Sequence, residues 1–296
     1  MADITLLDGG MGQELVHRAG DRPTALWSTQ VMIDRPGLVA EIHRDYFDAG
    51  ATVATTNTYA IHRDRLTFAG IENQFDALHA AALKEAATAQ RDGTRIAGAI
   101  GPLVASYRPD VHPAADQAIP LYTEVANILA PQVDLLICET VVSVDHARSI
   151  LAAATQTGKP VWLAVSVDDR DGAKLRSGEP LADVIPVAKE GGAAALLINC
   201  SSPEAVSQGL PVIADCGLPF GGYANGFTQI TSDFLEENPT VDALTQRRDM
   251  GPDAYAGHVM AWIGLGATIV GGCCEVGPAH IRAMADAIRE AGHRIV

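Results

Sequence analysis

The chain has 296 residues, 48% of them hydrophobic, which is enough for one large α/β domain and more than a small two-layer module needs. Its 36 acidic side chains outnumber its 21 basic ones and leave a formal net charge of -15. This balance argues against a nucleic-acid or anionic-membrane ligand, so we expect a small molecule or a soluble partner.

Residues 1–8 carry an acid at Asp3 and no basic region before an apolar run, so neither a signal peptide nor a transit peptide is predicted. Every apolar run is interrupted before it is long enough to span a membrane. We therefore expect a cytoplasmic protein. In that compartment an odd count of five cysteines argues against a disulfide framework and favours metal binding or thiol chemistry.

Short apolar, β-branched runs alternate with longer stretches of helical spacing along the chain. The predicted strands are Ile4–Asp8, Ala51–Thr56, Arg95–Ile100, Asp134–Glu139, Val161–Val167, Ala194–Asn199, Phe220–Ala224 and Ala267–Gly271. The predicted helices are Gly37–Ala49, Gln74–Arg91, Gln117–Ala130, Val144–Thr155, Leu181–Lys189, Pro203–Ala214, Pro252–Gly264 and Pro278–Ala291. Prolines at three helix starts, with Ser202 as an N-cap, and glycines before the next strands support these boundaries.

Eight strands that are apolar on both faces and alternate with eight helices predict a parallel sheet closed into a (β/α)8 (TIM) barrel. We expect residues 1–296 to form this barrel as a single domain. A doubly wound open sheet is the alternative, but no G-x-G-x-x-G motif follows the first strand. Two long connections, 102–116 and 226–251, are candidate covers of the barrel mouth. The second, with Asp233, Glu236 and Glu237, is equally explained as a solvated acidic loop.

Three cysteines fall at the C-terminal ends of predicted strands, where barrel enzymes carry their chemistry. Cys200 follows the sixth strand, and Cys273 and Cys274 follow the eighth. Their side chains would diverge in a regular strand, but the two preceding glycines allow an irregular backbone that turns both sulfurs inward. Three thiolates would make a tetrahedral zinc site with one open position, which a thiol substrate can fill.

Zinc would serve to acidify that thiol. An alkyl thiol with a pKa of about 8.5 is mostly protonated at neutral pH, and coordination removes the proton while the sulfur stays nucleophilic. By itself, Cys200 is better explained as a small buried residue, whereas the Gly-Gly-Cys-Cys run favours metal or thiol chemistry. We assign Cys138 and Cys216 structural roles, because Cys138 precedes Glu139 and so faces the other side of its strand.

Polar side chains also end several strands. Asp8 and Glu139 end apolar strands, where binding of a substrate ammonium is favoured over a structural ion pair. Asn57 and Asn225 either bind substrate or cap loops. The nine histidines contain no H-E-x-x-H motif, and those on predicted helices, such as His280, are interpreted as structural.

Taken together, Asp8-Gly9-Gly10, Asn199-Cys200 and Gly271-Gly272-Cys273-Cys274, followed by Pro278 and His280, resemble the homocysteine S-methyltransferase family over nearly the whole chain. The resemblance implies a (β/α)8 barrel with Zn²⁺ on Cys200, Cys273 and Cys274. It also implies that the amino and carboxylate groups of homocysteine lie near Asp8, Gly9, Asn57 and Glu139, and we add Asn225 to this set.

The family includes enzymes that use S-methylmethionine or betaine, and the homocysteine-binding module of cobalamin-dependent methionine synthase. This chain is too short for the cobalamin and folate modules, so direct transfer from a small sulfonium or ammonium donor, such as S-methylmethionine or S-adenosylmethionine, is expected to give methionine. The alternatives are a thiol-activating subunit of a corrinoid-dependent system and a non-catalytic zinc-binding barrel. The oligomeric state is left open.

One motif departs from the resemblance. Many S-methylmethionine-type members carry Pro-Asn-Ser-Gly-Glu after the seventh strand, whereas this chain reads Tyr223-Ala224-Asn225-Gly226-Phe227, so the donor is not defined. Aromatic rings can bind a sulfonium or quaternary ammonium by cation-π contact. The candidates for this role are Trp27, Tyr59, Tyr107, Tyr223 and Phe227.

Overall fold

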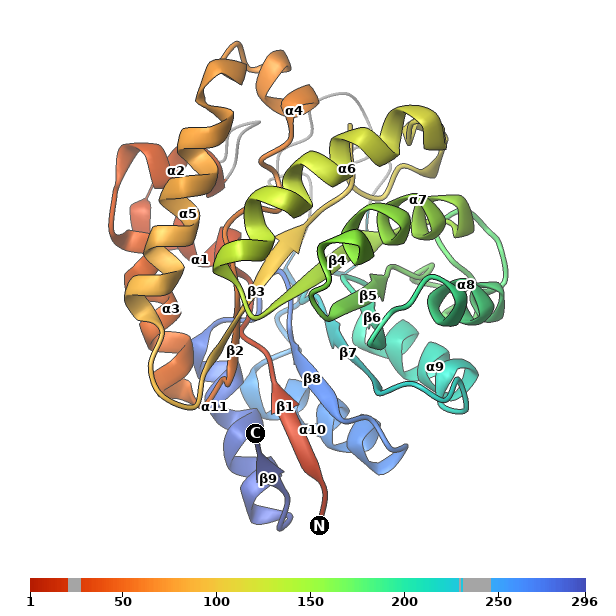
Figure 1. The fold of residues 1–296 in the computed structure, drawn as a ribbon. Coiled ribbons are helices and arrows are strands. Elements are labelled where there is room, and N and C mark those ends of the chain that lie inside the picture. Colours follow the sequence, from red (N-terminus) through yellow and green to blue (C-terminus); the bar gives the residue numbers. More distant parts are fainter. Residues whose placement is uncertain (21–27, 229, 231–245) are drawn as a thin grey trace.

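The protein is described by a computed structural model that covers residues 1–20, 28–228, 230 and 246–296 (Figure 1). Its strands are all parallel and form one sheet in the order β2-β3-β4-β5-β6-β7-β8-β1-β9. They are β1 (Asp3–Leu6), β2 (Val53–Thr55), β3 (Arg95–Ile100), β4 (Leu135–Val141), β5 (Val161–Val165), β6 (Ala195–Asn199), β7 (Phe220–Ala224), β8 (Ile269–Gly272) and β9 (Arg294–Ile295).

The first and second strands close the barrel. A parallel bridge joins Leu7 to Val53, and the Asp8 amide donates to the Val53 carbonyl at 2.9 Å. At the other end of β1, Asp3 and Ile4 pair with β9 instead. The eight predicted strands therefore form the predicted (β/α)8 barrel, and β9 is a short addition that sequence periodicity did not indicate.

Helices surround the barrel (Figure 1). The eight predicted ones are α3 (Leu38–Ala49), α5 (Phe75–Ala89), α6 (Ala115–Leu129), α7 (Val144–Ala154), α8 (Val184–Glu190), α9 (Pro203–Ile213), α10 (Pro252–Gly264) and α11 (Pro278–Glu290). Three were not predicted: α1 (Met11–Ala19), α2 (Ser28–Asp34) and α4 (Arg63–Phe68). Single 3₁₀ turns are η1 (Glu72–Gln74), η2 (Pro109–Val111), η3 (Ala130–Gln132), η4 (Thr155–Thr157) and η5 (Leu181–Asp183).

Local chemistry accounts for the helix ends. The Ser202 side chain accepts a hydrogen bond from the Ala205 amide and Pro203 occupies the first turn of α9, as predicted. Gly50 ends α3 in the left-handed region at φ 119°, a conformation that costs a side-chain-bearing residue free energy. These signals are local in sequence, which is why the helix boundaries were predictable.

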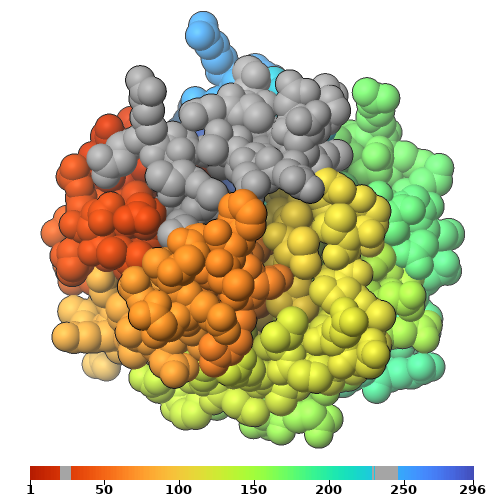
Figure 2. All heavy atoms as spheres, turned by 90° about the horizontal axis from the view of Figure 1, so that it is seen from above, coloured from red at the N-terminus to blue at the C-terminus, as the bar shows by residue number. Residues whose placement is uncertain are grey.

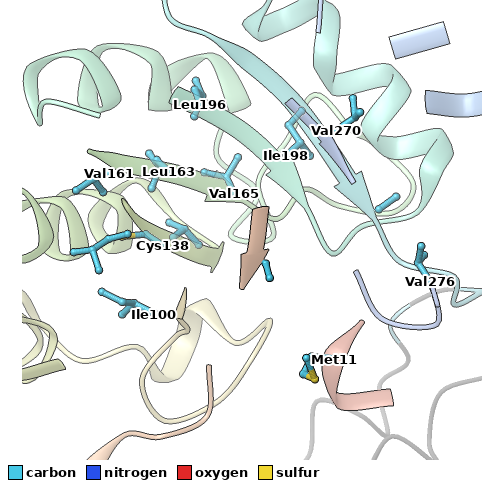
Figure 3. Packing of buried hydrophobic residues seen from close by; sticks show 14 of the residues in the cluster. Met11, Ile100, Cys138, Val161, Leu163, Val165, Leu196, Ile198, Val270 and Val276 are labelled. Carbon is cyan, nitrogen blue, oxygen red and sulfur yellow. The ribbon is translucent and has the colours of Figure 1, made fainter. Parts of the chain in front are cut away.

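Side chains of each strand alternate between two apolar layers. Along β4, Leu135 and Ile137 belong to the cluster inside the barrel. Leu136 and Cys138 belong to the larger cluster between the strands and the helices, where Cys138 lies near Ile100 (Figure 3). The alternation confirms that Cys138 faces away from the barrel interior, and it assigns the next odd residue, Glu139, to the interior.

The connections after the strands build the face of the molecule seen in Figure 2. There α4, in orange, lies beside the loop that follows β3, in yellow, and Arg65 donates to the Pro102 carbonyl at 2.9 Å. Among the described helices, none combines the length and apolarity needed to cross a bilayer. Asp233, Glu236, Glu237 and Trp27 lie outside the described residues.

Candidate metal centre and active site

Three cysteine sulfurs converge at the C-terminal end of the barrel. The Sγ atoms of Cys200, Cys273 and Cys274 all lie within 4.8 Å of one another, and those of Cys273 and Cys274 are 4.0 Å apart. Thiolates placed tetrahedrally at the usual Zn–S distance of about 2.3 Å would be ~3.8 Å apart. The three-thiol donor set, and the spacing between Cys273 and Cys274, therefore fit a zinc ion with three sulfur ligands.

Two of these sulfurs, those of Cys200 and Cys273, form a disulfide in the structure, while Cys274 is free. We expected no disulfide framework, and this single bond joins two candidate ligands instead of linking distant parts of the surface. Burial raises the pKa of the Cys274 thiol to about 12, and the neighbouring Glu275 and Glu139 add to the shift. Metal binding thus requires reduction of the disulfide and loss of the thiol proton.

A tight turn brings the adjacent sulfurs together. The Val276 amide donates to the Cys273 carbonyl at 3.1 Å, and Glu275 has a φ of 65°. We predicted that Gly271 and Gly272 would supply the irregular backbone, and this was wrong. Both lie in regular β8, and the left-handed residue of the turn is Glu275.

The glycines instead make room for neighbouring segments. A Cβ on Gly272 would lie 2.1 Å from Val276, and one on Gly9 would lie 1.9 Å from the Val276 carbonyl oxygen. A Cβ on Gly10 would lie 2.6 Å from the carbonyl oxygen of Cys273. Gly9 and Gly10 therefore let the chain after β1 pack directly on the turn at residues 273–276, which we call the cysteine turn. This close packing explains the glycines of both Asp8-Gly9-Gly10 and Gly271-Gly272-Cys273-Cys274.

Two predicted carboxylates are buried at the mouth without a basic partner among the described residues. Asp8, 2% exposed, accepts hydrogen bonds from the amide of Thr55 at 2.8 Å and from its hydroxyl at 3.1 Å. Glu139 accepts one from the Tyr223 hydroxyl at 2.8 Å. Burial raises the pKa of Glu139 to about 7 and that of Asp8 well above its usual range, with repulsion by Glu139 adding to the latter shift. A ligand cation would offset both effects.

The two predicted asparagines, Asn225 and Asn57, differ in the hydrogen bonding of their side-chain nitrogens. Asn225 accepts a hydrogen bond from the Phe227 amide at 3.1 Å, while its buried Nδ2 has no hydrogen-bond partner in the described structure. It therefore caps its loop and retains a donor. The Nδ2 of Asn57 points to α2, donating to the Ser28 carbonyl at 3.4 Å. The hydrogen bond of Asn57 thus supports the adjoining helix.

The aromatic residues predicted to face a methyl donor differ in whether they pack beside the cysteine sulfurs. Tyr107 and Phe227, both buried, pack in one cluster with Cys200 and Cys274. The Tyr59 hydroxyl lies 2.8 Å from the Ser106 hydroxyl, and Tyr59 does not belong to the cluster around the sulfurs. Of the described aromatics predicted to face a donor, Tyr107 and Phe227 thus border the sulfurs directly.

His280 has the structural role predicted for it. Its Nδ1 accepts a hydrogen bond from the Gly277 amide at 3.3 Å, and its Nε2 lies 3.2 Å from the Met250 carbonyl oxygen, to which it donates. The ring ties the start of α11 to the segment before α10. It therefore supports the backbone that follows the cysteine turn.

Two site residues were missed in the sequence. Arg176 and Asp169 form an ion pair at 2.9 Å with side chains only 9% and 10% exposed, and Arg176 donates to the Cys200 carbonyl at 3.4 Å. The available signal was the charged run Asp168-Asp169-Arg170-Asp171 directly after the fifth strand. We named no residue from that strand end, although it opens on the same rim.

The fold and the site together define a class of protein. A closed (β/α)8 barrel places three convergent sulfurs and two buried carboxylates at the end where barrel enzymes work. The rings of Tyr107 and Phe227, which we call the aromatic wall, lie there as well. Strained backbone is concentrated there as well, because Thr140, Cys200 and Glu275 all have positive φ. These features are those of a barrel enzyme with a thiolate metal centre.

Comparison with known proteins gives the family. The family model described as homocysteine S-methyltransferase matches residues 5–288. The chain is 29% identical to the homocysteine S-methyltransferase of Escherichia coli (strain K12), over 95% of this chain and 94% of the relative. It is 25% identical to the homocysteine S-methyltransferase YbgG of Bacillus subtilis (strain 168), over 95% and 93%. The chain belongs to the homocysteine S-methyltransferase family and is a methyltransferase.

Similarity to solved structures supports the same family and fold. The metallated form of the homocysteine methyltransferase MmuM from Escherichia coli superposes with a TM-score of 0.80 at 28% identity, covering 96% of each chain. The oxidized form of the same protein superposes with a TM-score of 0.81 at 27% identity, again over 96% of each. The barrel architecture predicted from the sequence is thereby confirmed.

Proposed function

We propose that residues 1–296 act as one domain that transfers a methyl group from a small sulfonium donor to the thiol of homocysteine, giving methionine, with zinc on Cys200, Cys273 and Cys274. The observation that carries the proposal is the convergence of three cysteine sulfurs within 4.8 Å beside two buried carboxylates. When bound, zinc lowers the pKa of a coordinated substrate thiol.

The carboxylates suit the amino group of the acceptor. Asp8 and Glu139 are buried, repel each other and have no basic partner among the described residues. An ammonium group between them would favour ionisation of both, because an opposite charge lowers a carboxyl pKa. Asn225 offers its buried Nδ2 as a donor to the acceptor's carboxylate or to the donor.

The remaining step is a substitution at the methyl carbon. The homocysteine sulfur forms a bond to that carbon while the bond to the sulfonium sulfur breaks, and its electron pair leaves with a neutral thioether. The thiol proton is released to solvent before transfer. Tyr107 and Phe227 exclude water beside the sulfurs and can face a positive donor with their rings.

The test is direct. Reduced, zinc-loaded protein is incubated with L-homocysteine and, in parallel, S-methylmethionine, S-adenosylmethionine, betaine or dimethylsulfoniopropionate, and methionine is quantified by mass spectrometry. We expect methionine from a sulfonium donor and its loss in Cys273→Ser. Cys138→Ser is the matched control, because this buried cysteine lies behind the barrel wall. No methionine from any donor, with zinc present, would contradict the proposal and favour a corrinoid-carrying partner or a non-catalytic barrel.

The aromatic wall is tested separately. Replacing Tyr107 and Phe227 singly by Leu keeps an apolar side chain but removes the ring. We expect the donor KM to rise several-fold for each variant while the homocysteine KM changes little. An unchanged donor KM in both variants would exclude these rings from donor binding.

A further inference from the structure

A buried ion pair lies directly behind the candidate ligand Cys200. The guanidinium of Arg176 makes two parallel hydrogen bonds to Asp169, with Nη1 2.9 Å from Oδ2 and Nη2 3.0 Å from Oδ1. The two side chains are 9% and 10% exposed. Burial of two charges carries a desolvation cost, which the two parallel hydrogen bonds between them offset.

On one side the pair holds the backbone of Cys200. Nη2 of Arg176 donates to the Cys200 carbonyl at 3.4 Å, and the Ser166 hydroxyl lies 3.3 Å from the same oxygen. Nε of Arg176 in turn donates to the Ser166 hydroxyl at 3.1 Å. Cys200 has a φ of 45°, a left-handed conformation that a residue with a side chain keeps only when its surroundings enforce it.

On the other side the pair holds neighbouring segments of the site. The Asp169 carboxylate accepts hydrogen bonds from the amide of Ser202, at 2.9 Å, and from that of Ile230, at 3.1 Å. The Arg176 guanidinium also lies 5.2 Å from the ring centre of Tyr107. One ion pair thus connects the segments after β3, β5, β6 and β7 at the point where the sulfurs meet.

We propose that Asp169 and Arg176 are positioning residues that hold the Cys200 thiolate in the geometry needed to bind metal. The inference rests on the proposed zinc site. The pair orients the ligand through its backbone, since its contacts are to the carbonyl of Cys200 and to the amide two residues further on. Loss of partners that orient metal ligands typically weakens metal binding about 10- to 100-fold.

The experiment measures metal affinity without any turnover. Reduced, metal-free protein is titrated with Co²⁺ against a competing chelator, and the sulfur-to-cobalt charge-transfer absorption is followed. The variants are Arg176→Met, Asp169→Asn and Arg176→Lys, which keeps the charge but loses the planar fork. The control is Arg63→Met, because Arg63 makes a similar two-pronged contact with Glu124, at 2.7 and 2.6 Å, between α4 and α6.

We expect Arg176→Met and Asp169→Asn to bind Co²⁺ about 10- to 100-fold more weakly, Arg176→Lys to fall between them and the parent, and Arg63→Met to match the parent. Parental affinity in Arg176→Met and Asp169→Asn, with only a lower Tm, would overturn the positioning role and leave the zinc site intact. The parent should show a charge-transfer band that disappears in Cys273→Ser. Without such a band, both the zinc site and the positioning role would be wrong. The paired variant Asp169→Leu with Arg176→Met serves if the single variants do not fold, because it leaves no unpaired buried charge, and parental affinity in it would equally overturn the proposal.

Discussion

The hydroxyl of Tyr223 donates a hydrogen bond of 2.8 Å to Oε1 of Glu139 across the barrel mouth. Both side chains belong to the barrel, Tyr223 on β7 and Glu139 on β4, and both are buried. The bond opposes the effect of burial and so keeps the pKa of Glu139 from rising beyond about 7. The hydrogen bond from Tyr223 therefore affects the pH at which Glu139, a predicted substrate-binding residue, is ionised.

Tyr223→Phe removes that bond and is expected to raise the pKa of Glu139 by about one to two units, since a hydrogen bond to a charged group contributes about 1.5–3 kcal/mol. Less of the carboxylate is then ionised at pH 7. We expect the rise of kcat/KM for homocysteine with pH to move upward by about one to two pH units. Measuring kcat/KM for homocysteine from pH 5.5 to 9 checks this. An unshifted profile would show that ionisation of Glu139 does not control kcat/KM in this range.

Glu139→Gln is expected to stabilise the reduced, metal-free protein at alkaline pH. The folded-state pKa of about 7 lies above the unfolded value of 4.5, so the stabilising effect of the proton is present below pH 4.5 and is lost as pH rises through 7. The free energy of unfolding of the variant should exceed that of the parent by up to about 3 kcal/mol at pH 8. Urea unfolding at pH 5 and pH 8 measures it. Equal differences at both pH values would contradict the assigned pKa.

The buried histidines predict a loss of stability in acid. Burial lowers the pKa of His62 to about 4 and that of His43 to about 3, and the ring nitrogens of His43 have no hydrogen-bond partner in the described structure. The folded pKa values lie below the unfolded value of 6.5, so these groups contribute stability above pH 6.5 that is lost as pH falls toward 4 and 3.

His62→Phe should therefore make the free energy of unfolding less dependent on pH between 6.5 and 4.5, by up to about 3 kcal/mol. Urea unfolding of parent and variant across this interval checks the slope. His17→Gln, at an exposed position of α1, is the control and should keep the parental slope. A His62→Phe protein with the parental slope would show that this ring is not kept neutral by burial.

Gly10→Ala is expected to displace the cysteine turn, because its Cβ would lie 2.6 Å from the Cys273 carbonyl oxygen. We expect a lower Tm and a Co²⁺ affinity reduced at least tenfold, since metal binding needs all three sulfurs in place. Gly257→Ala in α10 is the control. Nothing lies within 4 Å of its Cβ, so alanine should be neutral or stabilising by about 0.5–1 kcal/mol. Parental metal binding by Gly10→Ala would show that the turn adjusts freely.

Local patterns were sufficient for the main architecture. Eight strands and eight helices followed from apolar periodicity with glycine and proline at the boundaries, and the strand ends brought Cys200 to Cys273 and Cys274 because parallel strands of a barrel all open on one rim. Helices α1, α2 and α4 were missed. In α1 the segment begins among glycines with low helix propensity, and packing of the buried Leu15 outweighs that preference.

The sequence by itself thus determined the barrel and the identity of the converging side chains, since both depend on periodicity and on the order of strands. Only the tertiary structure decided how the site is held. The disulfide between Cys200 and Cys273 depends on contacts between segments far apart in the chain. So do the hydrogen bonds from Arg176 to the Cys200 carbonyl and from the Ser202 and Ile230 amides to Asp169. Such contacts leave no periodic trace in the residues that make them, because their geometry is set only when the barrel closes.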